Sequence, residues 1–134
     1  MNAARFALAF GLLAAPSLAA AQNKPYTITV APVKAKAGQP ATASVVIKPA
    51  AGFHMNKEFP TSLKLKPPEG VTVAKASLNK GDAKLDEQEA RFEVVATAAT
   101  AGRKEIPGDL RFAVCSSTSC DPQRAPITVQ LEAN

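Results

Sequence analysis

Apolar and polar residues alternate with a period of two along most of the chain after residue 22, and helical periodicity is nearly absent. Because successive side chains of a β-strand point to opposite faces, each such run has one apolar face that must pack against another layer. About seven or eight short strands, separated by Pro and Gly, predict an all-β fold, an immunoglobulin-like antiparallel β-sandwich. The clearest runs are residues 26–30, 41–47, 63–66, 71–73, 92–94, 110–114 and 127–131.

The first 21 residues have the organisation of a secretory signal peptide. They begin with a lone Arg5, continue through an apolar stretch at 6–18 and end in Ala19-Ala20-Ala21, a cleavage site of the A-x-A type. The apolar stretch is about 13 residues long and falls short of the roughly 20 that a spanning helix needs. We therefore expect cleavage before Gln22 and a periplasmic or secreted protein, with neither a lipid-bearing cysteine near the site nor a twin arginine.

Residues 22–134 have the length of one domain with one core. The chain has no tryptophan, so the core must be built from aliphatic residues and from Phe53, Phe59, Phe92 and Phe112. Sixteen basic residues against eleven acidic ones give a net charge of +5, but the cations are spread along the whole chain. A nucleic-acid surface would cluster them with aromatics. We expect a monomer that does not bind nucleic acid and whose basic surface favours an acidic partner or an anionic membrane.

Cys115 and Cys120 are the only cysteines, and they lie where a strand pattern breaks into a Ser/Thr turn. In an exported protein such a pair meets an oxidising environment. If the apolar residues of 110–114 point into the core, Cys115 has the opposite parity and should emerge toward solvent or a neighbouring loop. A disulfide across the mouth of the hairpin is then feasible. It would stabilise the fold by only about 2 kcal/mol, against about 4.7 kcal/mol for a loop near 100 residues.

The residues around this pair resemble the N-terminal periplasmic domain of the thiol:disulfide interchange protein DsbD, also called the disulfide bond corrector family. The likeness covers most of residues 25–132 and rests on 112–122, on the strand at 127–131 and, more weakly, on Gly-Phe-His-Met-Asn at 52–56. It implies an immunoglobulin-like sandwich. In that family a cap loop with an aromatic side chain shields the cysteines, and the segment aligned with it, about 76–82, offers Leu78 and no aromatic.

The resemblance implies that Cys115 and Cys120 are a redox pair that shuttles between dithiol and disulfide. The protein would then be a component of a protein thiol:disulfide oxidoreductase system. The chain ends at Asn134, so we expect it to exchange electrons in trans with a membrane electron-transfer protein or a periplasmic thioredoxin-like protein. Arg124 would favour the thiolate of Cys120 if it came close, and the alternative is a solvated arginine. The alternative function is a non-redox, immunoglobulin-like protein-binding module whose disulfide is a local clip.

A copper site is the third interpretation, because one imidazole, one thioether and two thiolates can hold Cu(I). Its candidates are His54 and Met55, but adjacent residues of a strand point to opposite faces and no histidine follows Cys115. We expect instead that Phe53 and Met55 pack inward while His54 lies on the surface, and that no metal is bound. Hydrolase, P-loop and dinucleotide motifs are absent, so we expect no cofactor and no small-molecule substrate.

Overall fold

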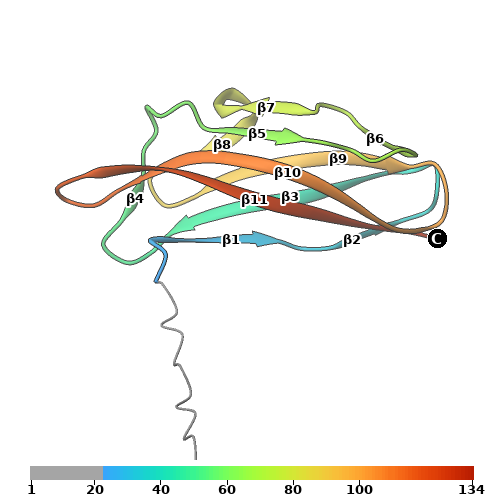
Figure 1. Cartoon of the computed structure of the whole chain (residues 1–134), viewed down its shortest axis with the longest axis horizontal. Helices are drawn as coiled ribbons and strands as arrows, with labels where there is room; N and C mark the ends of the chain where they lie inside the picture. The colour runs from blue at the N-terminus through green and yellow to red at the C-terminus, as the bar shows by residue number, and fades with distance from the viewer. Residues whose placement is uncertain (1–22) are drawn as a thin grey trace, which may run out of the picture.

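The computed structural model describes residues 23–134. The predicted signal peptide, residues 1–21, lies outside the described residues. Within them the chain forms eleven strands and one short 3-10 helix, arranged as two sheets that pack face to face (Figure 1). The prediction of an all-β, immunoglobulin-like sandwich is therefore confirmed. Within this part of the chain, no helix has the length and apolar character required to cross a membrane.

The first sheet has the strand order β1-β3-β9-β6, and β8 pairs with β9 beside β6. All of its pairs are antiparallel. On β3 the apolar residues Ala43, Val45 and Ile47 are buried and alternate with more exposed ones, as their period of two predicts. The strands are β1 (Tyr26–Val30), β3 (Pro40–Pro49), β6 (Val71–Val73), β8 (Ala83–Leu85) and β9 (Ala90–Ala98).

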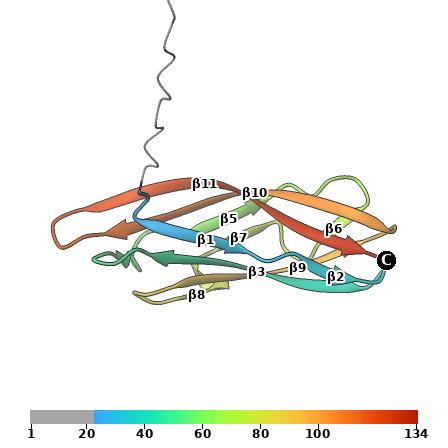
Figure 2. The same cartoon turned by 90° about the horizontal axis from the view of Figure 1, so that it is seen from below.

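The second sheet has the order β2-β11-β10-β5-β7, and the short β4 pairs with the end of β10. The pair of β2 with β11 is parallel, and the other pairs of this sheet are antiparallel. Figure 2 shows this sheet lying over the first. The strands are β2 (Val33–Ala35), β4 (His54–Met55), β5 (Ser62–Leu65), β7 (Ser77–Asn79), β10 (Gly102–Cys115) and β11 (Cys120–Ala133).

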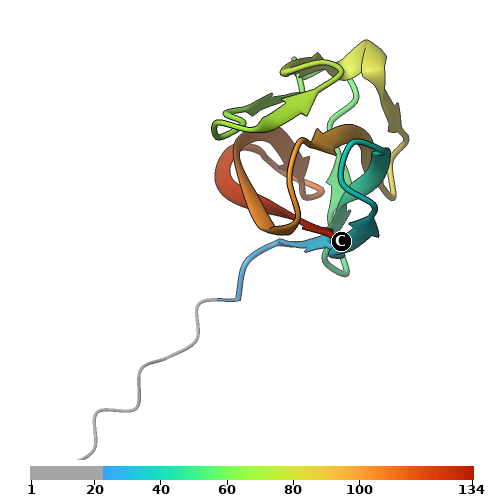
Figure 3. The same cartoon turned by 90° about the vertical axis from the view of Figure 1, so that its right-hand side faces the viewer.

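The core lies between the two sheets and draws on both. Phe92 from the first sheet and Phe112 from the second are fully buried, and the ring of Tyr26 meets that of Phe112 edge to face at 4.7 Å between centroids. Phe53 and Phe59 are only partly buried, so two of the four phenylalanines carry most of the aromatic packing. Viewed from the end at which the C-terminus lies, the strands enclose this core on all sides (Figure 3).

Four strands of two or three residues were not predicted, namely β2, β4, β7 and β8. They are too short to show a period of two, and pairing with distant strands defines them instead. The polar stretch 79–89 holds the 3-10 helix η1 (Lys80–Asp82) and β8. Asn79 caps η1 by accepting a hydrogen bond from the N–H of Gly81 at 2.8 Å, while the Asp82 carboxylate accepts one from the N–H of Asn79 at 2.9 Å.

Candidate functional site at the hairpin disulfide

The hairpin of β10 and β11 is the longest element of the fold, with its two 14-residue strands paired from Gly102 opposite Ala133 to Cys115 opposite Cys120. A four-residue turn closes it. The N–H of Ser116 donates to the Ser119 carbonyl at 2.8 Å, and the Ser116 hydroxyl accepts from the N–H groups of Thr118 and Ser119, each at 3.2 Å. One serine hydroxyl therefore orders the turn that separates the two cysteines.

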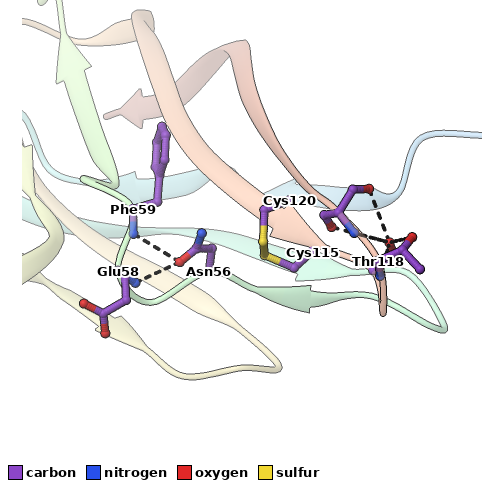
Figure 4. The surroundings of a disulfide bond; sticks show 8 residues. Asn56, Glu58, Phe59, Cys115, Thr118 and Cys120 are labelled. Atoms are coloured by element: carbon purple, nitrogen blue, oxygen red, sulfur yellow. Dashed lines mark hydrogen bonds between the residues drawn. A yellow bond between two sulfur atoms is a disulfide. The ribbon is translucent and has the colours of Figure 1, made fainter.

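Cys115 and Cys120 form a disulfide across the mouth of this hairpin (Figure 4). They are directly opposite residues, with 3.9 Å between their Cα atoms, which marks a non-hydrogen-bonded pair of the ladder. The two cysteines differ in exposure, because residue Cys115 is 3% exposed whereas Cys120 is an exposed residue. A thiol arriving from solvent therefore meets the Cys120 side of the bridge first.

Cys115 has the predicted parity, and of the two surroundings that the sequence leaves open, solvent or a neighbouring loop, the structure shows the second. Phe112 and Val114 point into the core, so Ala113 and Cys115 belong to the outer face of the sheet, yet both are buried. At this end of β10, β4 pairs with it and places His54 opposite Cys115. The polypeptide that follows β4, rather than solvent, flanks the cysteine strand.

The loop of residues 56–61 is this flanking segment, and it lies beside the disulfide (Figure 4). The N–H of Asn56 donates to the carbonyl of Ala113 at 2.9 Å, two residues before Cys115. The Asn56 side-chain oxygen accepts hydrogen bonds from the N–H groups of Glu58 at 2.9 Å and Phe59 at 3.3 Å. One asparagine thus ties the loop to β10 and fixes its turn.

The segment 76–82, aligned with the family's cap loop, is not the polypeptide beside the cysteines. It forms β7 and η1, and β7 pairs with β5 on the side away from β10. Leu78 is buried in the core and is not available to cover the disulfide. The nearby aromatic is Phe59 of the 56–61 loop, which antiparallel pairing of β4 with β10 brings to this end of the sheet. Lys80 supports this loop by donating to the carbonyl of Lys57 at 3.1 Å.

His54 and Met55 form the unpredicted strand β4, and their exposures agree with the expectation that Met55 packs inward while His54 lies on the surface. Met55 is fully buried, His54 is exposed, and Phe53 packs partly buried against the core. The imidazole and the thioether therefore lie on opposite faces and do not converge on one ion. In residues 23–134 no group of three or more His, Cys, Asp or Glu side chains is arranged to hold a metal.

Arg124 does not approach Cys120, so the structure favours the alternative of an exposed arginine over a role for Arg124 at a Cys120 thiolate. β11 runs as extended chain from Cys120 to Arg124, so the four-residue separation places these two residues about 13 Å apart along the strand. Instead Arg124 binds Asp109 with Nε–Oδ1 and Nη2–Oδ2 distances of 2.8 Å each. This hydrogen bond holds the pKa of Asp109 below its ordinary value of 3.8 and raises the pKa of Arg124.

No protein-family model matches the chain, and no curated protein sequence matches it. Solved structures match at low similarity: AggA, the major subunit of aggregative adherence fimbriae type I from Escherichia coli, is 14% identical, over 82% of this chain and 95% of the other, with a TM-score of 0.45. WR4, an MSP family member of C. elegans, is 13% identical, over 80% and 97%, with a TM-score of 0.41. A conjugative transposon lipoprotein from Bacteroides eggerthii is 17% identical, over 78% and 96%, with a TM-score of 0.39. Likeness at this level carries no argument about function, and the resemblance to the interchange family rests on residues 112–122, on the strand at 127–131 and, more weakly, on residues 52–56.

The site is thus a disulfide at the tip of a hairpin in a β-sandwich. Disulfides are typical of proteins outside the reducing cytosol, in agreement with the predicted export. The bridge as it stands already meets the requirements of a structural clip, the second of the functions that the sequence leaves open. Exchange requires, in addition, a partner thiol with access to one of the sulfurs.

Proposed function

We propose that this protein takes part in thiol:disulfide exchange in the periplasm or outside the cell, using Cys115 and Cys120 to accept two electrons from the dithiol of a thioredoxin-like or membrane-bound partner. The observation that carries the proposal is the difference in exposure between the two cysteines. Cys120 is exposed at the tip of a hairpin, whereas Cys115 is buried beside β4. Exchange through one accessible sulfur with a shielded leaving group is an arrangement suited to a defined mixed disulfide.

The chemistry follows from that asymmetry. A partner thiolate attacks Sγ of Cys120, a new S–S bond forms, and the bond to Cys115 breaks. The Cys115 sulfur leaves with the electron pair as a thiolate and takes a proton from water. The partner's second thiolate then attacks its own sulfur in the mixed disulfide and expels the Cys120 thiolate. The partner ends as a disulfide, two electrons poorer, and this protein ends as a dithiol.

The small loop closed by the bridge supports a role other than stabilisation. The cysteines are five positions apart, for which the chain-entropy relation gives only about 2 kcal/mol. The pairing of β10 with β11 also continues from residue 102 to residue 114 without help from the bridge. The hairpin therefore has enough contacts to persist when the disulfide opens, as a redox cycle requires.

The second candidate is a non-redox protein-binding module in which the disulfide is a structural clip. The burial of Cys115 and the ordered 116–119 turn favour it, because both shelter the bridge from attack. In this case binding would use the sandwich surface and would not depend on thiols. The two functions differ in the reduction potential of the pair.

The deciding experiment is to equilibrate the mature protein in defined thiol buffers, trap free thiols and count them by mass. A midpoint between about −120 and −270 mV supports exchange, whereas a midpoint below about −300 mV indicates a structural bridge and the binding module. Single variants then test the direction of attack. With glutathione disulfide, Cys115→Ser, which keeps the exposed Cys120, should form a mixed disulfide faster than Cys120→Ser, which keeps the buried thiol. Equal rates would contradict the assignment of Cys120 as the attacked sulfur.

A further inference from the structure

A groove of about 530 Å³ opens on the outer face of the second sheet, at the same end as the disulfide. Phe59 and Pro60 of the 56–61 loop form an apolar wall, and Lys80 and Arg111 supply two cationic side chains. Thr61 also lines the groove but is only 1% exposed, and its buried hydroxyl has no hydrogen-bond partner in the part of the chain that the structure describes. Such a mixture of apolar walls and a few polar groups is typical of a binding groove.

The charge of the groove is unbalanced. Its lining includes Lys80 and Arg111 but no Asp or Glu. Within residues 23–134, neither cation has a carboxylate at salt-bridge distance. The nearby acid on β10 is Asp109, whose carboxylate already binds Arg124. An anionic group entering the groove would therefore meet unpaired positive charge.

The groove and the disulfide share one face of one strand. Arg111 and Cys115 have the same parity on β10, and Arg111 lies opposite Arg124 as Cys115 lies opposite Cys120. Four residues of strand place the Arg111 row about 13 Å from the cysteine row. An extended peptide spans the same distance in about four residues. A partner chain whose cysteine reaches Cys120 can thus set a side chain four positions away over the cationic end of the groove.

The free edge of β11 is poorly suited to a partner strand. Among residues 23–134, the one strand besides β10 that pairs with β11 is β2, at Leu131 to Ala133. Because Cys115 and Cys120 are a non-hydrogen-bonded pair, the even-numbered residues of β11 turn their backbone groups toward this edge. Pro122 and Pro126 are two of these residues and lack an N–H, which blocks regular strand addition. A partner is therefore met on the face of the sheet rather than at its edge.

We propose that the groove at Arg111 and Lys80 is a docking subsite for an acidic segment of the exchange partner, with a carboxylate about four residues from the partner's reactive cysteine. This inference rests on the proposed exchange function and adds the chemistry by which the partner is recognised. The cations attract the segment, Phe59 and Pro60 pack against its apolar atoms, and the segment's cysteine is held over Cys120. Opposite charge of this kind raises association rates by about 10-fold or more at low salt.

The test measures the rate constants with which three reduced peptides attack the disulfide of the intact oxidised protein. Their sequences are Cys-Gly-Ser-Gly-Glu, Cys-Gly-Ser-Gly-Lys and Cys-Glu-Gly-Ser-Gly, all with blocked ends, and uncharged dithiothreitol is run beside them. At an ionic strength of about 0.01 M, where charges act over about 30 Å, the first peptide should react at least about 5-fold faster than the second. The first peptide should also react faster than the third, and its advantage in rate should vanish near 1 M salt.

Arg111→Glu should invert the preference, so that the Lys peptide becomes the faster one. Lys36→Glu is the matched control, because it makes the same change of charge beside Asn134 at the opposite end of the β10–β11 hairpin, and it should keep the wild-type ratio. Equal rates for the Glu and Lys peptides, or an unchanged ratio in Arg111→Glu, would overturn the subsite. If dithiothreitol reduces the pair at a midpoint above about −270 mV while the peptides show no preference, only the subsite fails; a midpoint below about −300 mV removes the exchange function itself.

Discussion

Cys115 and Cys120 are bonded to each other as directly opposite residues of one hairpin, 3.9 Å apart at their Cα atoms. A bridge between residues already held together by a ladder adds little constraint to the folded state. Its opening frees the two sulfurs without separating the strands, since pairing continues through residues 102–114. The position of the disulfide is therefore better suited to reversible chemistry at the hairpin tip than to holding distant parts of the chain together.

Replacing both cysteines with serine should lower the free energy of unfolding by about 2 kcal/mol, because the loop that they close is short. The variant should keep the wild-type circular dichroism spectrum and should lose all thiol exchange. Urea unfolding of oxidised protein, reduced protein and variant gives the comparison. A loss well above the predicted value, or an unfolded variant, would show that the bridge is needed to hold the sandwich together.

Asp109 and Arg124 should make stability depend on pH in the acid range. The hydrogen bond from Arg124 lowers the pKa of Asp109 below 3.8, so the folded protein binds a proton at this carboxyl less readily than the unfolded chain does. The stabilisation is present above the unfolded pKa and is lost as pH falls through the lower folded value. Asp109→Asn should therefore be less stable than wild type near neutral pH and should converge with it as pH falls through the lowered pKa of Asp109.

Urea midpoints measured between about pH 2 and pH 7 test this expectation. Arg124→Gln is the control, because it leaves Asp109 in place and removes the side chain that lowers its pKa. It should remove the same pH-dependent part of the stability. Arg124→Gln should also leave the rate of dithiothreitol attack on the disulfide unchanged, since β11 carries this arginine about 13 Å from Cys120. A slower attack would restore a role for Arg124 at the cysteines.

A methyl group at Gly108 should fit only if neighbouring core side chains shift. A Cβ built at this position would lie 3.1 Å from carbon atoms of Leu63, Leu65 and Ile127, all of which are buried in the core. Gly108→Ala should therefore lower the free energy of unfolding by about 1–3 kcal/mol, despite the gain expected from a less flexible unfolded chain. In a double-mutant cycle with Leu65→Ala, the loss of unfolding free energy in the double variant should be smaller than the sum of the losses in the two single variants, because the smaller side chain at position 65 makes room for the methyl group. Full additivity would contradict the packing argument.

The long strands could be predicted from the sequence because their side chains decide their faces locally. Leu110, Phe112 and Val114 are apolar at every second position, and each is fully buried. The position of β4 could not be predicted this way, because two residues carry no period and their place depends on pairing with Val114 and Cys115 far along the chain. The burial of Cys115 follows from that long-range pairing, which is why the sequence left open whether this cysteine would face solvent or a neighbouring loop.

The surroundings of the cysteines show the same limit. Arg124 is four residues from Cys120 in the sequence, but an extended strand converts this short separation into a large distance. Its actual partner, Asp109, lies on the other strand, and only the register that sets Asp109 opposite Pro126 reveals the contact. The disulfide itself was predictable, because both cysteines flank a single turn and nothing distant is needed to bring them together.

Asn56 controls how well the 56–61 loop is held beside the disulfide. Its side-chain oxygen accepts the N–H groups of Glu58 and Phe59, and its own N–H donates to the carbonyl of Ala113. Asn56→Ala removes the first two bonds and keeps the third. We expect a loss of about 1 kcal/mol in unfolding free energy and an increase of several-fold in the rate of dithiothreitol attack, because a looser loop opens a second route of attack, at Cys115, beside the existing one at Cys120.

Asn56→Asp is the matched variant, because a carboxylate oxygen accepts the same two hydrogen bonds and keeps the turn. Uncharged dithiothreitol keeps the added negative charge from biasing the comparison. If the loop is the shield, Asn56→Asp should react at nearly the wild-type rate and only Asn56→Ala should react faster. If both variants react like wild type while Asn56→Ala is measurably less stable, the loop is loosened without effect on the bridge, and the shielding of Cys115 must come from β4, which pairs directly with the cysteine strand.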